Sequence, residues 1–175
     1  MFFSVFLRFL RLESITIIIQ RLFRQNVGWC QKSYKWGGIY IYENYVLFNK
    51  NKTILIAYRS KNSNYTIPKS VSTIGDFAFG GSEYLQKIII PNSVNSIGDG
   101  AFALCCCLEN IIIPKSIKII KQASFYGCKT LTNIDIPQSV TTIKKGAFRN
   151  CKSLTSINIP NSVTNIGKSA FSYCI

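Results

Sequence analysis

The chain has 175 residues, 47% of them hydrophobic, which is enough for one domain with a real core. It carries 21 Lys and Arg against 7 Asp and Glu, so its formal net charge is +14. Histidine is absent, which excludes the commonest general base and a common metal ligand. A chain this basic attracts polyanions, but composition alone does not assign a partner.

Residues 1–36 form a basic and apolar leader that follows no repeat. Arg8 and Arg11 interrupt its apolar runs, and none reaches the roughly 18 residues that a membrane span needs. No clear signal peptide is visible either, because a secretory signal carries its positive charge ahead of an unbroken apolar core. A cleaved signal and an amphipathic anchor that contacts a membrane surface remain open. We favour a leader whose apolar residues cover the open end of the structure that follows.

Residues 37–61 contain two strand-like runs, Tyr45–Phe48 and Thr53–Ala57, with the polar turn Asn49–Lys52 between them. This arrangement is typical of a β-hairpin. Because the terminal unit of a repeat array needs a cover, we expect the hairpin to cap the first unit of the segment that follows.

Residues 62–175 repeat with a period of 23 residues, which gives about five units. A fixed period of about 20–50 residues indicates a solenoid, in which each unit buries its apolar side against its neighbours. No polar cap follows the last unit, so its end is expected to be exposed, continued by further units or covered by a second chain. All five prolines and a column of phenylalanines share the period: Pro68, Pro91, Pro114, Pro137, Pro160, Phe79, Phe102, Phe125, Phe148 and Phe171.

One unit reads L-x-x-I-x-I-P-x-S-V-x-x-I-G-x-x-A-F-x-x-C, as in the stretch that begins at Leu154. The alternation in L-x-x-I-x-I predicts a short, half-buried strand, which the proline ends. The glycine, Gly167 in this unit, is expected at a turn. The serine, here Ser162, is expected to bond the local backbone through its hydroxyl. In the unit from Ile111 a lysine replaces the glycine and a serine replaces the alanine, so its turn is expected to differ.

The motif I-P-x-S-V-x-x-I-G-x-x-A-F-x-x-C-x-x-L resembles the BspA-like subclass of leucine-rich repeats, found in surface proteins of certain anaerobic bacteria and parasitic protists. The resemblance covers roughly residues 40 to 175. It implies a β-rich, right-handed leucine-rich-repeat solenoid with short parallel strands on a concave face. It also implies a non-enzymatic interaction or adhesion module at the cell surface or secreted, with a protein or glycan ligand on host or neighbouring cells. An intracellular repeat scaffold without a surface role is the alternative.

The cysteines favour packing over chemistry. A column of four follows the 23-residue period, and a spacing of that length is not a metal-binding motif. We expect buried, reduced thiols in this column, with disulfides and a metal site as less favoured alternatives. Cys106 and Cys107 fall outside the column and are expected to be more exposed. The column consists of Cys105, Cys128, Cys151 and Cys174.

The outward positions of the predicted strands form the candidate binding face. They hold no nucleophile–base pair and no carboxylate dyad, so no enzyme and no cofactor is expected. Two isoleucines make an apolar spot on a surface that is otherwise small and polar. The face comprises Gln86, Lys87, Ile89, Glu109, Asn110, Ile112, Thr132, Asn133, Asp135, Thr155, Ser156 and Asn158.

Basic residues concentrate in the third and fourth units and make a candidate polyanion patch. A solvated lysine surface is the interpretation we favour, because the whole chain is rich in Lys, Asn and Ile. No aromatic residues interleave with the basic ones on the strands, so specific nucleic-acid binding is not expected. The patch comprises Lys115, Lys118, Lys121, Lys129, Lys144, Lys145, Arg149 and Lys152.

Overall fold

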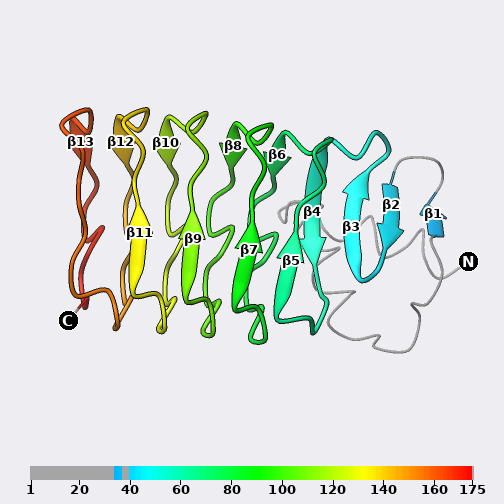
Figure 1. Cartoon of the computed structure of the whole chain (residues 1–175), viewed down its shortest axis with the longest axis horizontal. Coiled ribbons are helices and arrows are strands. Elements are labelled where there is room, and N and C mark those ends of the chain that lie inside the picture. The colour runs from blue at the N-terminus through cyan, green and yellow to red at the C-terminus, as the bar shows by residue number, and fades with distance from the viewer. Residues whose placement is uncertain (1–33, 37–39, 175) are drawn as a thin grey trace, which may run out of the picture. The chain divides into compact units, whose positions relative to one another are not determined.

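The repeat region coils into rungs (Figure 1). The first four have a strand on one side and a shorter strand on the other, and the last has the shorter strand alone. The structure is a computed structural model that describes residues 34–36 and 40–174. The interpretations of the leader fall almost wholly on residues outside this part of the chain. The elements of this part of the chain are all strands, and wherever strands of neighbouring rungs pair, they pair in parallel. The predicted β-rich solenoid with parallel strands is therefore confirmed.

An antiparallel hairpin precedes the coil, as predicted, and continues directly into it. The turn between its strands is fixed by Asn49, whose Oδ1 accepts hydrogen bonds from the amides of Thr53 and Ile54 at 2.8 and 2.9 Å. The last hairpin strand also pairs in parallel with the first short strand of the coil, which covers that edge. The four strands are β1 (Tyr34–Trp36), β2 (Tyr40–Glu43), β3 (Val46–Asn49) and β4 (Ile54–Tyr58).

Two parallel ladders run along the coil, and we call them the long-strand sheet and the short-strand side. The long-strand sheet consists of β5 (Asn64–Thr66), β7 (Lys87–Ile89), β9 (Asn110–Ile112) and β11 (Asn133–Asp135). The short-strand side consists of β6 (Thr73–Ile74), β8 (Ser96–Ile97), β10 (Ile119–Ile120), β12 (Thr142–Ile143) and β13 (Asn165–Ile166).

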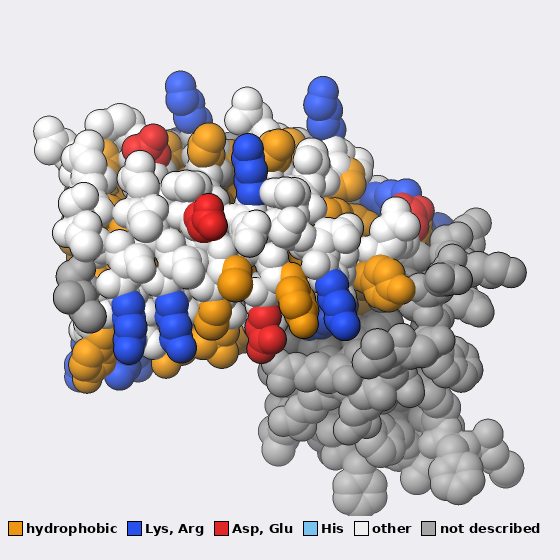
Figure 2. Space-filling model, turned by 60° about the horizontal axis from the view of Figure 1, so that its bottom comes forward, with side chains coloured by type: hydrophobic (Ala, Val, Ile, Leu, Met, Phe, Trp, Pro, Cys, Tyr) orange, Lys and Arg blue, Asp and Glu red, His pale blue; other side chains and the backbone are white. Residues whose placement is uncertain are grey.

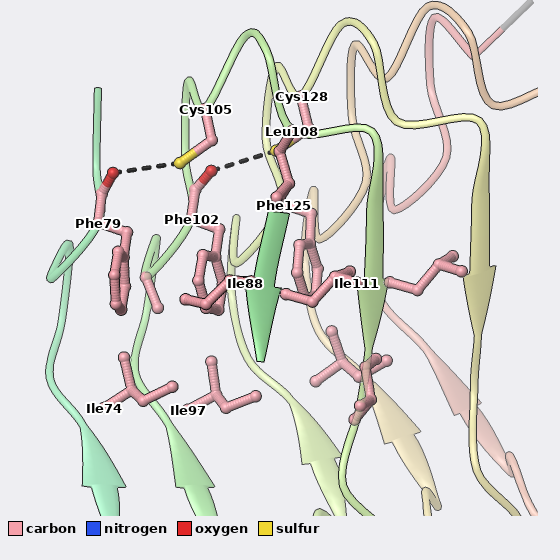
Figure 3. Close-up of a cluster of buried hydrophobic side chains, with 14 of the residues drawn as sticks. Ile74, Phe79, Ile88, Ile97, Phe102, Cys105, Leu108, Ile111, Phe125 and Cys128 are labelled. Atoms are coloured by element: carbon pink, nitrogen blue, oxygen red, sulfur yellow. Dashed lines mark hydrogen bonds between the residues drawn. The ribbon is translucent and has the colours of Figure 1, made fainter. Parts of the chain in front are cut away.

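The core between the two ladders is built from columns of identical side chains (Figure 3). The rings of Phe79, Phe102 and Phe125 stack with centroids 5.0 and 5.5 Å apart, and the series continues to Phe171 at 5.3 Å per step. Tyr58 of the hairpin adds a ring at the start, 5.0 Å from Phe79. The hairpin therefore joins the same aromatic column as the repeats.

The cysteine column lies inside this core. Cys105, Cys128 and Cys151 are fully buried and reduced, and each thiol donates a hydrogen bond to a phenylalanine carbonyl of the preceding rung, at 3.1–3.2 Å. Figure 3 shows the first two of these bonds. Burial raises the pKa of Cys105 and of Cys151 to about 12. Cys106 and Cys107 are half-buried, so the predicted contrast holds against the three buried column members. Cys174, the last of the column, is itself half-buried.

The serine column bonds the backbone, but in the neighbouring rung and not locally as predicted. Ser93 and Ser139 donate hydroxyl hydrogen bonds to a carbonyl of the preceding rung, at 2.8 and 2.7 Å, and Ser116 does the same. These bonds tie one rung to the next rather than capping a local turn. Ser162 differs, because its buried hydroxyl has no partner among the described residues.

The rung that departs from the repeat pattern interrupts the ladders. β8 and β10 do not pair, and β7 pairs with β9 at one position only, Lys87 with Asn110. In this rung Lys121 replaces the glycine and Ser124 replaces the alanine. The Ser124 hydroxyl is buried and lies 3.4 Å from the carbonyl of Gly98 in the rung before, so it occupies space that alanine leaves open. The aromatic column crosses this step without a break.

The repeat glycine stands at a turn, as expected, since the carbonyls of Gly98 and Gly167 accept hydrogen bonds from the amides of Ala101 and Ala170 at 3.3 and 3.2 Å. It also serves close packing between rungs. A Cβ on Gly98 would lie 2.5 Å from the amide nitrogen of Asp76, and one on Gly167 would lie 2.4 Å from that of Lys145. Left-handed backbone occurs elsewhere, in two columns per rung. One column contains Phe77, Gly100, Ala123, Gly146 and Ser169, and the other contains Gly81, Leu104, Gly127, Asn150 and Tyr173.

The aromatic column predicts that Phe125→Ala lowers the free energy of unfolding by about 3–5 kcal/mol, the usual cost of deleting a buried aromatic ring. Neighbouring rungs should loosen as well, because each rung packs only on the adjacent ones. Chemical denaturation measures the loss. A midpoint equal to that of the wild type would show that the ring does not support the core.

The buried thiols should react slowly with a thiol reagent in the native state at both pH 7 and pH 9, although the rate should still rise about tenfold per pH unit as the small thiolate fraction grows. The reason is that only the thiolate reacts, and a pKa of about 12 keeps it scarce at Cys105 and Cys151. Mass spectrometry after timed labelling gives the rate at each site. Half-buried Cys106 and Cys107 are internal controls that should label sooner. Fast native labelling at Cys128 would contradict the buried column.

Ala123→Gly should stabilise the chain by up to about 1 kcal/mol, since glycine adopts left-handed backbone without the steric cost that alanine pays there. A rise of about 2–4 °C in melting temperature would correspond to that gain. Ala101→Gly is the matched control, because Ala101 is buried and not left-handed. It should lower the melting temperature; a drop in both variants would refute the assignment of strain to Ala123.

Candidate binding surfaces

Nine of the twelve residues predicted as a binding face lie in or directly before β7, β9 and β11 of the long-strand sheet, and all twelve are exposed. The other three, Thr155, Ser156 and Asn158, lie at the equivalent place in the last rung, where no strand forms. The strand residues point outward because each strand alternates exposed, buried and exposed residues, with Ile88, Ile111 and Ile134 turned into the core. Figure 2 shows charged and hydrophobic side chains scattered among backbone atoms and side chains of other types. This surface is a continuous polar platform held by a rigid core.

The apolar spot lies on two neighbouring strands of this platform. Ile112 is 77% exposed and Ile89 is 53% exposed. Both stand two residues beyond the paired Lys87 and Asn110, so they lie on the same side of adjacent strands. Across the next step Ile112 pairs with Asp135, which places a carboxylate beside the isoleucine.

Tyr84 is an exposed aromatic residue that the sequence analysis did not select. It precedes β7 by three residues and is 54% exposed, and the ammonium of Lys61 lies 6.0 Å from its ring centroid. The sequence could have revealed it, because an aromatic residue stands here where the equivalent positions one and two units later have the smaller Cys107 and Thr130.

The residues of the predicted polyanion patch lie at several different places in the rungs. Lys121, Lys144 and Lys145 follow the short strands, whereas Lys115 lies in the turn after its proline. A further group lies in the turns that return the chain to the long-strand sheet, and it consists of Lys129, Arg149 and Lys152. Figure 2 shows basic side chains side by side along one edge, with an acidic one farther along.

The lysines beside the short strands form what we call the short-strand ridge. Its members are exposed except for Lys121, which is half-buried. Lys168 completes it and was missed from the sequence, although it stands one repeat after Lys145. The ridge comprises Lys118, Lys121, Lys144, Lys145 and Lys168.

Earlier rungs carry acids in the column where Lys145 and Lys168 stand, and those acids hydrogen-bond the next rung. Oδ1 of Asp76 accepts a hydrogen bond from the amide of Asp99 at 2.8 Å, and Oδ1 of Asp99 accepts one from the amide of Gln122 at 3.0 Å. The column thus changes from acidic to basic along the coil.

Within residues 34–36 and 40–174, no group of three or more Cys, Asp or Glu side chains is arranged to hold a metal ion. A helix that is long and apolar enough to cross a membrane does not occur in that part of the chain.

Comparison with solved structures places the coil among bacterial leucine-rich repeat proteins. A leucine-rich cell surface protein of Faecalibacterium prausnitzii is 38% identical, with a TM-score of 0.74 over 78% of this chain and 37% of that one. The leucine-rich repeat protein TpLRR of T. pallidum is 32% identical, with a TM-score of 0.67 over 69% and 59%. The pneumococcal vaccine antigen PcpA is 29% identical, with a TM-score of 0.68 over 75% and 34%.

The matched part of this chain therefore spans between about a third and three fifths of the length of these proteins. No curated protein matches the chain. The model of the BspA-type leucine-rich repeat region matches residues 56–175 in six copies. The stacked 23-residue rungs and this match agree: the chain belongs to the BspA-type leucine-rich repeat family.

Proposed function

We propose that this repeat module is an adhesion module of the cell surface or of a secreted protein, and that the long-strand sheet is its binding face. Ile112 carries the proposal: it is the most exposed of the large hydrophobic side chains in the described residues and stands on a rigid strand. Because this isoleucine is 77% exposed, a partner that covers it removes apolar surface from water, which favours binding.

The surroundings of Ile112 suit a protein or glycan partner. Small polar side chains such as Thr132 and Asn133 surround the apolar spot, and protein interfaces combine an apolar centre with a polar rim in the same way. The charges on this face are mixed, with Lys87 against Glu109 and Asp135, so the face does not select by net charge. Its rigid strands keep the ordering cost of binding low.

The cell-surface location is supported by the Faecalibacterium relative, which is described as a leucine-rich cell surface protein. Repeat proteins of this fold generally present their strand face to protein ligands. An intracellular scaffold would use the same face for a different partner, so the location and the binding face need separate tests.

Ile112→Asp should reduce adhesion of the purified chain to cultured epithelial cells or to cells of other bacteria by at least about tenfold, as expected for the centre of an interface. Apolar contact is not screened by salt, so wild-type adhesion should survive moderate salt. Flow cytometry of the labelled chain measures binding.

The matched control is Ile166→Asp, which places the same charge on a residue that is 53% exposed on the short-strand side. Its adhesion should stay within about twofold of the wild type. If Ile112→Asp binds as well as the wild type while remaining folded, the long-strand sheet is not the adhesive face. Surface labelling of intact source cells tests the location independently.

A further inference from the structure

The short-strand ridge carries like charges that the chain itself does not neutralise. Lys144 follows Ile143, and Lys121 follows Ile120, which pairs with Ile143 in the ladder. Neighbouring rungs in a parallel ladder stand about 4.8 Å apart, and like charges at that separation repel. An ion pair joins Lys52 and Glu43, and among the described residues no ion pair involves a lysine of the ridge.

The acidic rungs show what this column accepts. There the carboxylate of Asp76 bonds the amide of Asp99, and Oδ1 lies 2.5 Å from where a Cβ on Gly98 would stand. The missing Cβ of that glycine therefore leaves room for a carboxylate oxygen against the backbone. The bond between Asp76 and Asp99 therefore shows how a carboxylate binds at this turn.

The basic rungs keep the turn and replace the acid. Gly167 corresponds to Gly98, and a Cβ on it would again lie against backbone, 2.4 Å from the nitrogen of Lys145. Within the described residues the amides of Lys145 and Lys168 have no hydrogen-bond acceptor. Lysine has no oxygen to offer, so these donors and the ammonium groups of Lys144, Lys145 and Lys168 all favour an anion.

We propose that the short-strand ridge binds a linear anionic polysaccharide, one of whose sulfate or carboxylate groups hydrogen-bonds the amide of Lys168. The lysines recur over three rungs, which suits a chain that lies along the coil with anionic groups at intervals. This site is on the opposite ladder from the adhesive face and is independent of it.

The residues beside the ridge favour a polysaccharide over other polyanions. The neighbouring positions of β12 and β13 carry Thr141, Thr142 and Asn165. The hydroxyl of Thr141 donates to the carbonyl of Lys118 at 3.4 Å and the side-chain amide of Asn165 donates to Thr164, so the side-chain oxygens of Thr141 and Asn165 and the hydroxyl of Thr142 are the groups that can bond sugar hydroxyls. No aromatic side chain stands among the lysines of the ridge, so the stacking that holds single-stranded nucleic acid is missing.

The decisive variant is Lys145→Asp, which supplies the chain's own carboxylate to the Lys168 amide as Asp76 does to Asp99. The variant should keep or raise the melting temperature, yet bind heparin at least tenfold more weakly than the wild type. Lys152→Asp, which makes the same charge change in the turns before the long-strand sheet, should stay within about threefold. Lys145→Gln is a second variant that only removes charge, and Gln122 shows that glutamine fits the column.

Biolayer interferometry of the full chain with immobilised heparin, dextran sulfate, neutral dextran and polyglutamate provides the affinities. Both sulfated chains should bind, with affinity falling as salt rises, and neutral dextran should not. Equal losses in Lys145→Asp and Lys152→Asp would reduce the effect to net charge and overturn the site. Polyglutamate binding as tightly as heparin would overturn the polysaccharide in favour of an acidic peptide.

Amide NMR tests the contact itself. A sulfated oligosaccharide titrated into the labelled chain should shift the amide signal of Lys168 and leave that of Asp99, which already has the Asp76 carboxylate. Shifts confined to Lys129, Arg149 and Lys152 would place the ligand elsewhere and refute the proposal.

Discussion

The spacing of the rungs is the constraint on which the rest of this structure depends. Main-chain hydrogen bonding sets neighbouring strands about 4.8 Å apart, and the 23-residue period then puts like residues at that distance. A residue type fits a column only if its side chain can pack against the same side chain in the neighbouring rung. Phenylalanine does so by stacking, at 5.0–5.5 Å, and the cysteine thiol does so by bonding the preceding rung's carbonyl.

The same constraint decides what surface charges can do. In the aspartate column each charge has a partner within the coil, because the carboxylate of Asp76 accepts a hydrogen bond from the amide of Asp99 in the next rung. A lysine side chain has no acceptor atom, so it cannot bond the next amide in this way. The two kinds of rung therefore present opposite surfaces from one backbone geometry, and the change from acid to base occurs along a single column, without any change of fold.

The 23-residue period made the core and the buried cysteines predictable from the sequence, because both follow from apolar residues at fixed spacing. The hairpin was predictable from two strand-like runs with a polar turn between them. The exposure of Ile112 was predictable from alternation as well. The left-handed positions were not, since nothing in Phe77 or Leu104 marks a left-handed residue, and both are bulky where glycine is usual. The amide of Lys168 could not be found from the sequence either. Its significance appears only beside the bond between Asp76 and Asp99.

The rung that departs from the repeat pattern leaves a gap in one side of the coil that the other sides bridge. Between the second and third repeats β8 and β10 do not pair. The amides of Gly100, Phe102 and Leu104 still donate hydrogen bonds to carbonyls of the next rung at 2.7–2.8 Å, and the ring of Phe102 stacks on that of Phe125. A coil that is bonded on one side and open on the other has a hinge at that step. Bending there would change the angle between the rungs of Asp76 and Asp99 and the short-strand ridge without separating them.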